Sequence, residues 1–112
     1  MAVKAICSNP EKVLNEIKAA IRAGTVETWE LDTDWDLTHS PEQWKNQAWF
    51  RPSVQTGQLV FMIIGKESEA MSTEMYAVYH GRFIEMLLAH FDDKFSSASA
   101  TAQAILGEFV GP

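Results

Sequence analysis

The sequence predicts an α+β fold, in which two amphipathic helices enclose an antiparallel sheet in the order of the chain. Apolar residues recur at three- and four-residue spacing near both ends, and short runs of β-branched and aromatic residues lie between them. Two helices with one apolar stripe each need a sheet face that buries both stripes. We therefore expect a two-layer sandwich with three to four strands and the second helix packed on one sheet face.

The first helix is predicted between residue 10 and Gly24. Ser8 or Asn9 can cap it, because either side-chain oxygen accepts a free amide proton, and Pro10 falls where its missing N–H costs nothing. Gly24 supplies a left-handed stop at the C-terminal end. The apolar stripe consists of Val13, Leu14, Ile17, Ala20 and Ile21.

The middle of the chain contains the predicted strands. Thr56 and Gly57 form a short turn between two of them, and Pro52 indicates an edge or a bulge in the strand before that turn. The run after the turn is apolar on both faces, which places it centrally in the sheet. The predicted strands are residues 25–31, 48–54 and 58–64, with a polar turn or a short extra strand over 32–39.

Residues 73–79 are ambiguous, because they could form a fourth strand or open a long helix. Two tyrosines and a valine, with Gly81 shortly after them, favour the strand. The second helix is then predicted over residues 82–95, with a stripe of large apolar side chains.

The chain is predicted to consist of one domain followed by a C-terminal tail. We assign residues 1–95 to a single α+β domain and residues 96–112 to a loosely held tail, because small polar residues follow the second helix. Apolar residues appear again near the end of the tail and need a surface to cover. These residues, which we expect to dock on the domain or on a second copy of it, are Ile105, Leu106, Phe109 and Val110.

Charge and composition exclude several function classes. Fifteen acidic residues stand against nine basic ones, a net charge of −6, which argues against nucleic acid or an anionic membrane surface as a partner. No apolar run approaches the roughly 20 residues of a membrane-spanning helix. A lone cysteine and the lack of a signal peptide predict a cytoplasmic location. No phosphate-binding glycine loop or paired Cys-x-x-Cys is present, so we expect no cofactor.

Six of the acidic residues lie between residues 27 and 42, a region without lysine or arginine. Asp32, Asp34 and Asp36 alternate as carboxylates do in calcium-binding loops. The sixth position of such a loop requires Gly and is Leu37 here, and the twelfth requires Glu and is Gln43. The pattern therefore predicts a solvated acidic turn rather than a metal site.

All four tryptophans lie within residues 29–49. Tryptophan buries a large area yet carries an N–H that needs a partner, so it favours core edges, interfaces and ligand walls. The group could be a core under a long loop or a binding surface. As a surface beside so many acids, it would suit a small cationic or amphipathic ligand or a protein partner. The predicted ligand-binding residues are Trp29, Trp35, Trp44, Trp49 and Arg51.

Two histidines are the candidates for catalysis. His39 follows Asp34 and Asp36 closely enough to be turned toward a carboxylate, which would make it a general base. His80 stands at the predicted start of the second helix, where the helix end favours an anion. A packed structural histidine is the competing interpretation for each.

Two stretches, residues 32–52 and 79–85, resemble small bacterial proteins, some of which are carried on mobile gene cassettes; the shared pattern is DxDxDxTHSPEQWxxxAWFRP. The resemblance implies a bacterial, cytoplasmic single domain and brings no activity with it. Where a glycine is expected after Asp34, this sequence has Trp35, so the turn there differs.

The sequence thus predicts a binding or interaction module with an acidic, tryptophan-rich site, assembled as a homo-oligomer. The alternative is a small hydrolase- or isomerase-like enzyme that uses His39 or His80 with an aspartate. The arrangement of the histidines distinguishes the two, since the enzyme requires an imidazole that opens into a cavity with a carboxylate in reach.

Overall fold

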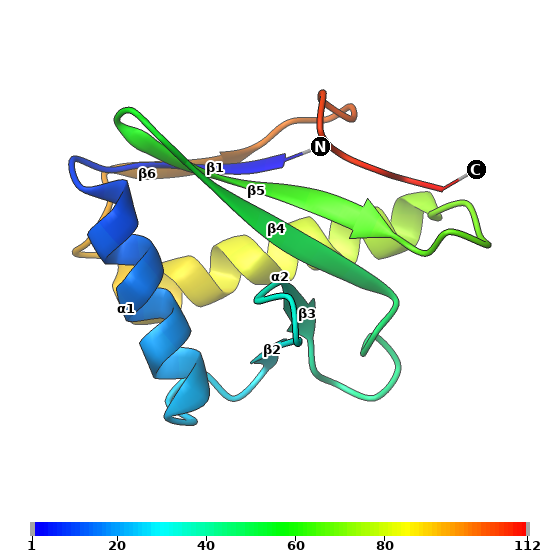
Figure 1. Ribbon diagram of the computed structural model, residues 1–112, viewed down its shortest axis with the longest axis horizontal. Coiled ribbons are helices and arrows are strands. Elements are labelled where there is room, and N and C mark those ends of the chain that lie inside the picture. The colour runs from blue at the N-terminus through cyan, green and yellow to red at the C-terminus, as the bar shows by residue number, and fades with distance from the viewer. Residues whose placement is uncertain (1, 112) are drawn as a thin grey trace.

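The computed structural model describes residues 2–111, which form two helices and an open antiparallel sheet of six strands (Figure 1). The sheet order is β2-β3-β4-β5-β1-β6, so β1, the first strand of the chain, lies between β5 and β6. No helix in this part of the chain is long and apolar enough to cross a bilayer. The helices are α1 (Pro10–Arg22) and α2 (Thr73–Phe91), and the strands are β1 (Ala2–Ile6), β2 (Trp29–Leu31), β3 (Leu37–His39), β4 (Ala48–Gln55), β5 (Gln58–Gly65) and β6 (Ser97–Ala100).

The β4–β5 hairpin is the longest pairing and divides the molecule into an inner and an outer side. Its two-residue turn contains Gly57 at a φ of +75°, a conformation that glycine adopts without a steric penalty. Phe50 pairs with Ile63, and both are fully buried in the core that the two helices share. The neighbouring pair, Trp49 and Ile64, points to the opposite face, because side chains alternate along a strand.

We call that opposite side of β4, β5, β1 and β6 the outer face. Its side chains include Lys4, Arg51, Val60, Met62 and Ile64, which follow from the registers of the three central strands. Val60 is buried there without belonging to the core cluster. None of the four strands contains aspartate or glutamate, so all fifteen carboxylates belong to other parts of the chain.

The predicted number of strands is wrong, because the sheet has six rather than three to four. Residues 2–6 form β1, and residues 97–100, which we placed in the tail, form β6. Each is short and rich in alanine or serine, which have little tendency to form strands by themselves. β1 becomes a strand because it pairs with β5 on one side and β6 on the other. Local sequence does not carry that information.

The predicted fourth strand over residues 73–79 is also wrong, because these residues form the first turns of α2. Ser72 caps the helix, with its side-chain oxygen 3.1 Å from the amide nitrogen of Met75. Tyr76, Tyr79 and Phe83 are buried along one side, which is the spacing of a helix rather than of a strand. Gly81 lies inside α2 with open space around it, so it does not end the element.

The C-terminal segment lies against the sheet next to the N-terminal strand (Figure 1). The Thr101 amide donates to the Ala2 carbonyl at 2.9 Å. Farther on, Phe109 runs parallel to the end of β5, where β1 no longer covers it: its amide donates to the Ile63 carbonyl at 3.1 Å, and its carbonyl accepts from the Gly65 amide. The segment therefore continues the sheet beyond β1.

Glu108 holds this segment in place. One carboxylate oxygen accepts from the Ile63 amide at 2.7 Å and the other from the Ile105 amide at 2.9 Å. The turn so formed lays Gly107 directly on Met62, where an added Cβ would lie 2.7 Å from the sulfur. Leu106, at the tip of the turn, is 98% exposed.

Candidate functional site

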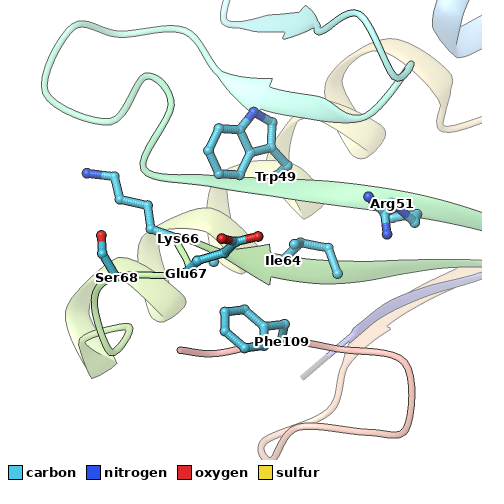
Figure 2. Close-up of a pocket in the computed structure, with 8 residues that line it drawn as sticks. Trp49, Arg51, Ile64, Lys66, Glu67, Ser68 and Phe109 are labelled. Atoms are coloured by element: carbon cyan, nitrogen blue, oxygen red, sulfur yellow. The ribbon is translucent and has the colours of Figure 1, made fainter. Parts of the chain in front are cut away.

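A concave region lies on the outer face, at the open end of the β4–β5 hairpin, where the C-terminal segment joins β5 (Figure 2). We call it the outer groove, and its volume is about 710 Å³. Three parts of the chain build it: β4, the end of β5 with the loop that follows, and the C-terminal segment. Its lining residues are Trp49, Arg51, Ile64, Gly65, Lys66, Glu67, Ser68 and Phe109.

Two aromatic rings face the groove from different segments. Trp49 comes from β4 and is half-buried, whereas Phe109 comes from the C-terminal segment and is 37% exposed. Figure 2 shows the Glu67 side chain running back over the sheet towards Ile64, with Trp49 on one side of it and Phe109 on the other. Lys66 extends in the opposite direction, towards the outer end of the groove. Aromatic surface and a carboxylate therefore line the same groove.

Arg51 lies at the other end of the groove, where an ion pair with Asp36 fixes its guanidinium group. Its Nη2 lies 2.9 Å from Oδ2 of Asp36, and its Nε lies 3.4 Å from Oδ1. The Asp36 side chain is only 7% exposed, whereas that of Arg51 is 53% exposed. This pair raises the pKa of Arg51, mainly through the hydrogen bonds to Asp36. The Nη1 group takes no part in either bond, so a fixed guanidinium edge remains available for an anion.

The four tryptophans do not form one site. Trp29 is 1% exposed and packs in the core against His39, Phe50, Tyr79 and Phe83. Trp44 is half-buried and packs on the same core. Trp35 is 47% exposed at the β2–β3 turn, with the Arg22 guanidinium 4.0 Å from its ring centre. Of the predicted ligand-binding residues, the structure brings only Trp49 and Arg51 into the outer groove.

His39 is a core residue in this fold. It is 4% exposed, and its Nδ1 lies 2.8 Å from the carbonyl oxygen of Thr28, which can only accept, so Nδ1 carries the proton. The pairing of β2 with β3 places His39 opposite Trp29 and thus beside the Thr28 backbone. Asp36, its expected partner, pairs with Arg51 instead. Burial lowers the pKa of His39 below its ordinary value, although the bond to Thr28 acts in the other direction.

His80 is buried as well, one turn after Tyr76 in α2. Its Nδ1 lies 2.7 Å from the Tyr76 carbonyl oxygen, its ring stacks on the Tyr76 ring at 4.0 Å, and its edge meets Phe50 at 5.1 Å. The position is the middle of a helix rather than the helix start that the sequence suggested. An anion-binding role at a helix end therefore does not apply.

The acidic residues 32–36 form the β2–β3 turn. Oδ1 of Asp32 accepts from the amides of Asp34 and Asp36, both at 2.9 Å, so backbone N–H groups occupy this carboxylate. Trp35 has a φ of +65°, which explains why a glycine is expected there. Within residues 2–111, no group of three or more His, Cys, Asp or Glu side chains is arranged to hold a metal ion.

Sequence reasoning missed the groove residues outside β4: Ile64, Lys66, Glu67 and Ser68 as site residues, and Phe109 as part of a cavity. One signal was available. A two-residue turn at Thr56 and Gly57 fixes the hairpin register and places Trp49 opposite Ile64 on the same face. No comparable signal brings Phe109 to this face, because its contacts join segments far apart in the chain.

Comparison with known proteins gives no family assignment: no protein-family model matches the chain, and neither the curated proteins nor the solved structures yield a significant match.

Proposed function

We propose that this protein is a non-enzymatic binding module whose ligand site is the outer groove. The observation that carries the proposal is that two solvent-accessible aromatic side chains, Trp49 and Phe109, line one groove although they come from segments 60 residues apart in the chain. Small-molecule sites are concave, largely apolar and equipped with a few oriented polar groups. The groove meets this description further, because Ile64 adds apolar surface, and Glu67 and the Arg51 fixed by Asp36 add polar groups. The ligand class is a small amphipathic molecule.

Binding is better supported than the alternative of a small hydrolase- or isomerase-like enzyme. Both candidate bases, His39 and His80, are buried, and the Nδ1 of each lies on a backbone carbonyl. Neither lines the outer groove. A general base must reach the proton that it removes, and these imidazoles serve the aromatic core instead.

An amphipathic dye tests the groove directly. We expect an anilinonaphthalene sulfonate to become fluorescent on binding to the wild-type protein, and the double variant Trp49→Ala/Phe109→Ala to lose most of that signal. Leu88→Ala is the matched control, because Leu88 is a 55% exposed apolar residue on α2, outside the groove. An unchanged signal in the double variant, with circular dichroism showing both proteins folded, would refute the groove as the site.

We further propose that the protein forms homo-oligomers through the turn at residues 105–108. Glu108 fixes this turn, yet Leu106 at its tip is 98% exposed and lies in the same segment as Phe109. Two apolar side chains, Leu106 and Phe109, are thus exposed within four residues, and exposed apolar surface that gathers in one place favours contact with another protein. Sedimentation velocity over a concentration series should show assembly that Leu106→Asp abolishes and Leu88→Asp leaves intact. A wild-type protein that stays monomeric at high micromolar concentration would contradict the proposal.

A further inference from the structure

We propose that the outer groove recognises a small zwitterion, with an alkylated ammonium group between Trp49 and Phe109 beside Glu67, and a carboxylate or phosphate group on Arg51. This inference rests on the proposed function and adds the chemical class of the ligand. Each half of the ligand is assigned by a different part of the groove.

The cationic half is assigned by the rings and by Glu67. An aromatic face attracts a cation through its quadrupole, and alkylated ammonium groups suit such faces because they are large and weakly hydrated. Glu67 is the one carboxylate among the lining residues, and in the view of Figure 2 its side chain lies between the two rings, beside Ile64. A neutral amphipathic ligand would offer no positive charge to pair with the Glu67 carboxylate. A cation bound in this part of the groove has aromatic faces and a negative charge among the groups that surround it.

The nearby positive charges do not oppose this placement. Lys66 extends away from the rings, and Arg51 lies two residues beyond Trp49 along β4, at the other end of the groove. No strand of the outer face contributes a further carboxylate. The lining residues therefore carry both signs, which matches a ligand that carries both signs.

The anionic half is assigned by Arg51. Asp36 fixes the guanidinium through Nε and Nη2, so Nη1 keeps its two donors in a set direction. Trp49 and Arg51 are two residues apart on one face of β4, a spacing of about 7 Å along a strand. A zwitterion whose charges are separated by a few bonds spans that distance. A longer or purely cationic ligand would use one end only.

Isothermal titration with three probes tests the two halves separately: choline, phosphocholine and the neutral choline isostere dimethylbutanol. We expect phosphocholine to bind best and choline to bind at least tenfold more tightly than the neutral isostere. Glu67→Gln should weaken choline and phosphocholine at least tenfold. Glu69→Gln is the matched control, because Glu69 is exposed in the same loop but does not line the groove. Arg51→Lys keeps a positive charge beside Asp36 but loses the fixed Nη1 donors, so it should weaken phosphocholine binding and leave choline binding unchanged.

The outcomes distinguish the zwitterion from the groove itself. Equal binding of choline and the neutral isostere, or no effect of Glu67→Gln, would overturn the cationic half. Equal binding of phosphocholine and choline to the wild-type protein would overturn the anionic half. In each case dye binding that depends on Trp49 and Phe109 would leave the groove standing as a site. Loss of that dependence would instead refute the proposed function.

Discussion

Ile63 and Ile64 are neighbours in β5 and have the same side chain, yet they belong to opposite sides of the molecule. Ile63 is fully buried against the core shared by the two helices. Ile64 is half-buried in the outer groove, between Trp49 of β4 and Phe109 of the C-terminal segment. Nothing in the residue type separates them. The strand alternation alone assigns one to stability and the other to a surface on which a ligand can bind.

The two faces differ in chemistry as well as in burial. The inner side is an aromatic core in which Phe83 contacts Trp29, Phe50 and Phe61 with ring centres 4.6–4.9 Å apart. The outer face combines apolar side chains with Lys4 and Arg51 and has no acidic residue in its strands. A chain with a net charge of −6 thus keeps one face free of strand carboxylates. The inner side is therefore a closely packed core, whereas the outer face carries the groove that we propose as a ligand site.

The largest expected effect is a difference in the free energy of unfolding between alanine variants of Ile63 and Ile64. Ile63→Ala should lower the free energy of unfolding by about 2–5 kcal/mol, because it leaves a cavity in a closely packed core. Ile64→Ala removes the same atoms from a partly hydrated position and should cost less than about 1 kcal/mol. Urea denaturation of both variants measures the difference. Equal costs would mean that the outer face is packed as tightly as the core.

A smaller effect should follow from releasing the segment that covers part of the outer face. Glu108→Ala leaves the amides of Ile63 and Ile105 without their acceptor, which costs about 1–3 kcal/mol when such groups are buried. Hydrogen exchange should accelerate most at Ile63, Gly65 and Phe109 and remain unchanged in α1.

Glu108→Gln is the informative control for this release. The amide keeps one carbonyl oxygen as an acceptor and so can satisfy one of the two N–H groups. We expect it to lie between the wild-type protein and Glu108→Ala in both stability and exchange. If Glu108→Ala exchanged like the wild-type protein at Phe109, the carboxylate would not be what holds the segment.

The smallest effect concerns pH and the inner side. An unfolded histidine takes up a proton as the pH falls through about 6.5, whereas buried His39 does so only at lower pH, because burial lowers its pKa. Between these two values the unfolded state binds more protons, so the free energy of unfolding falls as the pH falls. The stabilisation is complete above pH 6.5, and its loss is limited to about 1.4 kcal/mol per pH unit.

The matched variants are His39→Asn and His90→Asn. Asparagine keeps a donor near the Thr28 carbonyl but does not titrate, so His39→Asn should lose less stability than the wild-type protein between pH 7.5 and 5.5. His90 is exposed on α2, and its replacement should leave the pH dependence unchanged. Urea denaturation at both pH values decides this. An unaltered slope in His39→Asn would show that His39 charges in the native state as easily as in the unfolded one.

Local signals in the sequence predicted the elements that depend on them. A cap at Ser8 or Asn9 and the stripe from Val13 to Ile21 predicted α1. The structure confirms the helix, with Asn9 as its cap and Gly24 at a φ of +80° after it. The two-residue turn at Thr56 and Gly57 predicted the β4–β5 hairpin. The sequence did not predict β1 and β6, because β1 is stabilised by pairing with β5 and β6, and β6 by pairing with β1, rather than by the strand propensity of their own residues.

The same distinction explains the site. Trp49 and Arg51 were predicted because tryptophan and arginine are chemically conspicuous, and they do line the groove. Trp29 and His39 were equally conspicuous but lie in the core, where the β2–β3 pairing puts them opposite each other. Residue type indicates what a side chain can do, whereas the face it occupies depends on pairings that were not visible in the sequence.

The position of β1 between β5 and β6 bears on the order of folding. The Ala2 amide donates to the side chain of Thr101, 99 residues away along the chain, and closing so long a loop is entropically costly. The β4–β5 hairpin needs only a two-residue turn and can form early. The rate-limiting step should therefore be the insertion of β1, with most of the hairpin already structured in the transition state and β6 still unpaired. Phi values near one in the hairpin and near zero at Ala98 and Ala100 are the expected kinetic signature of this topology.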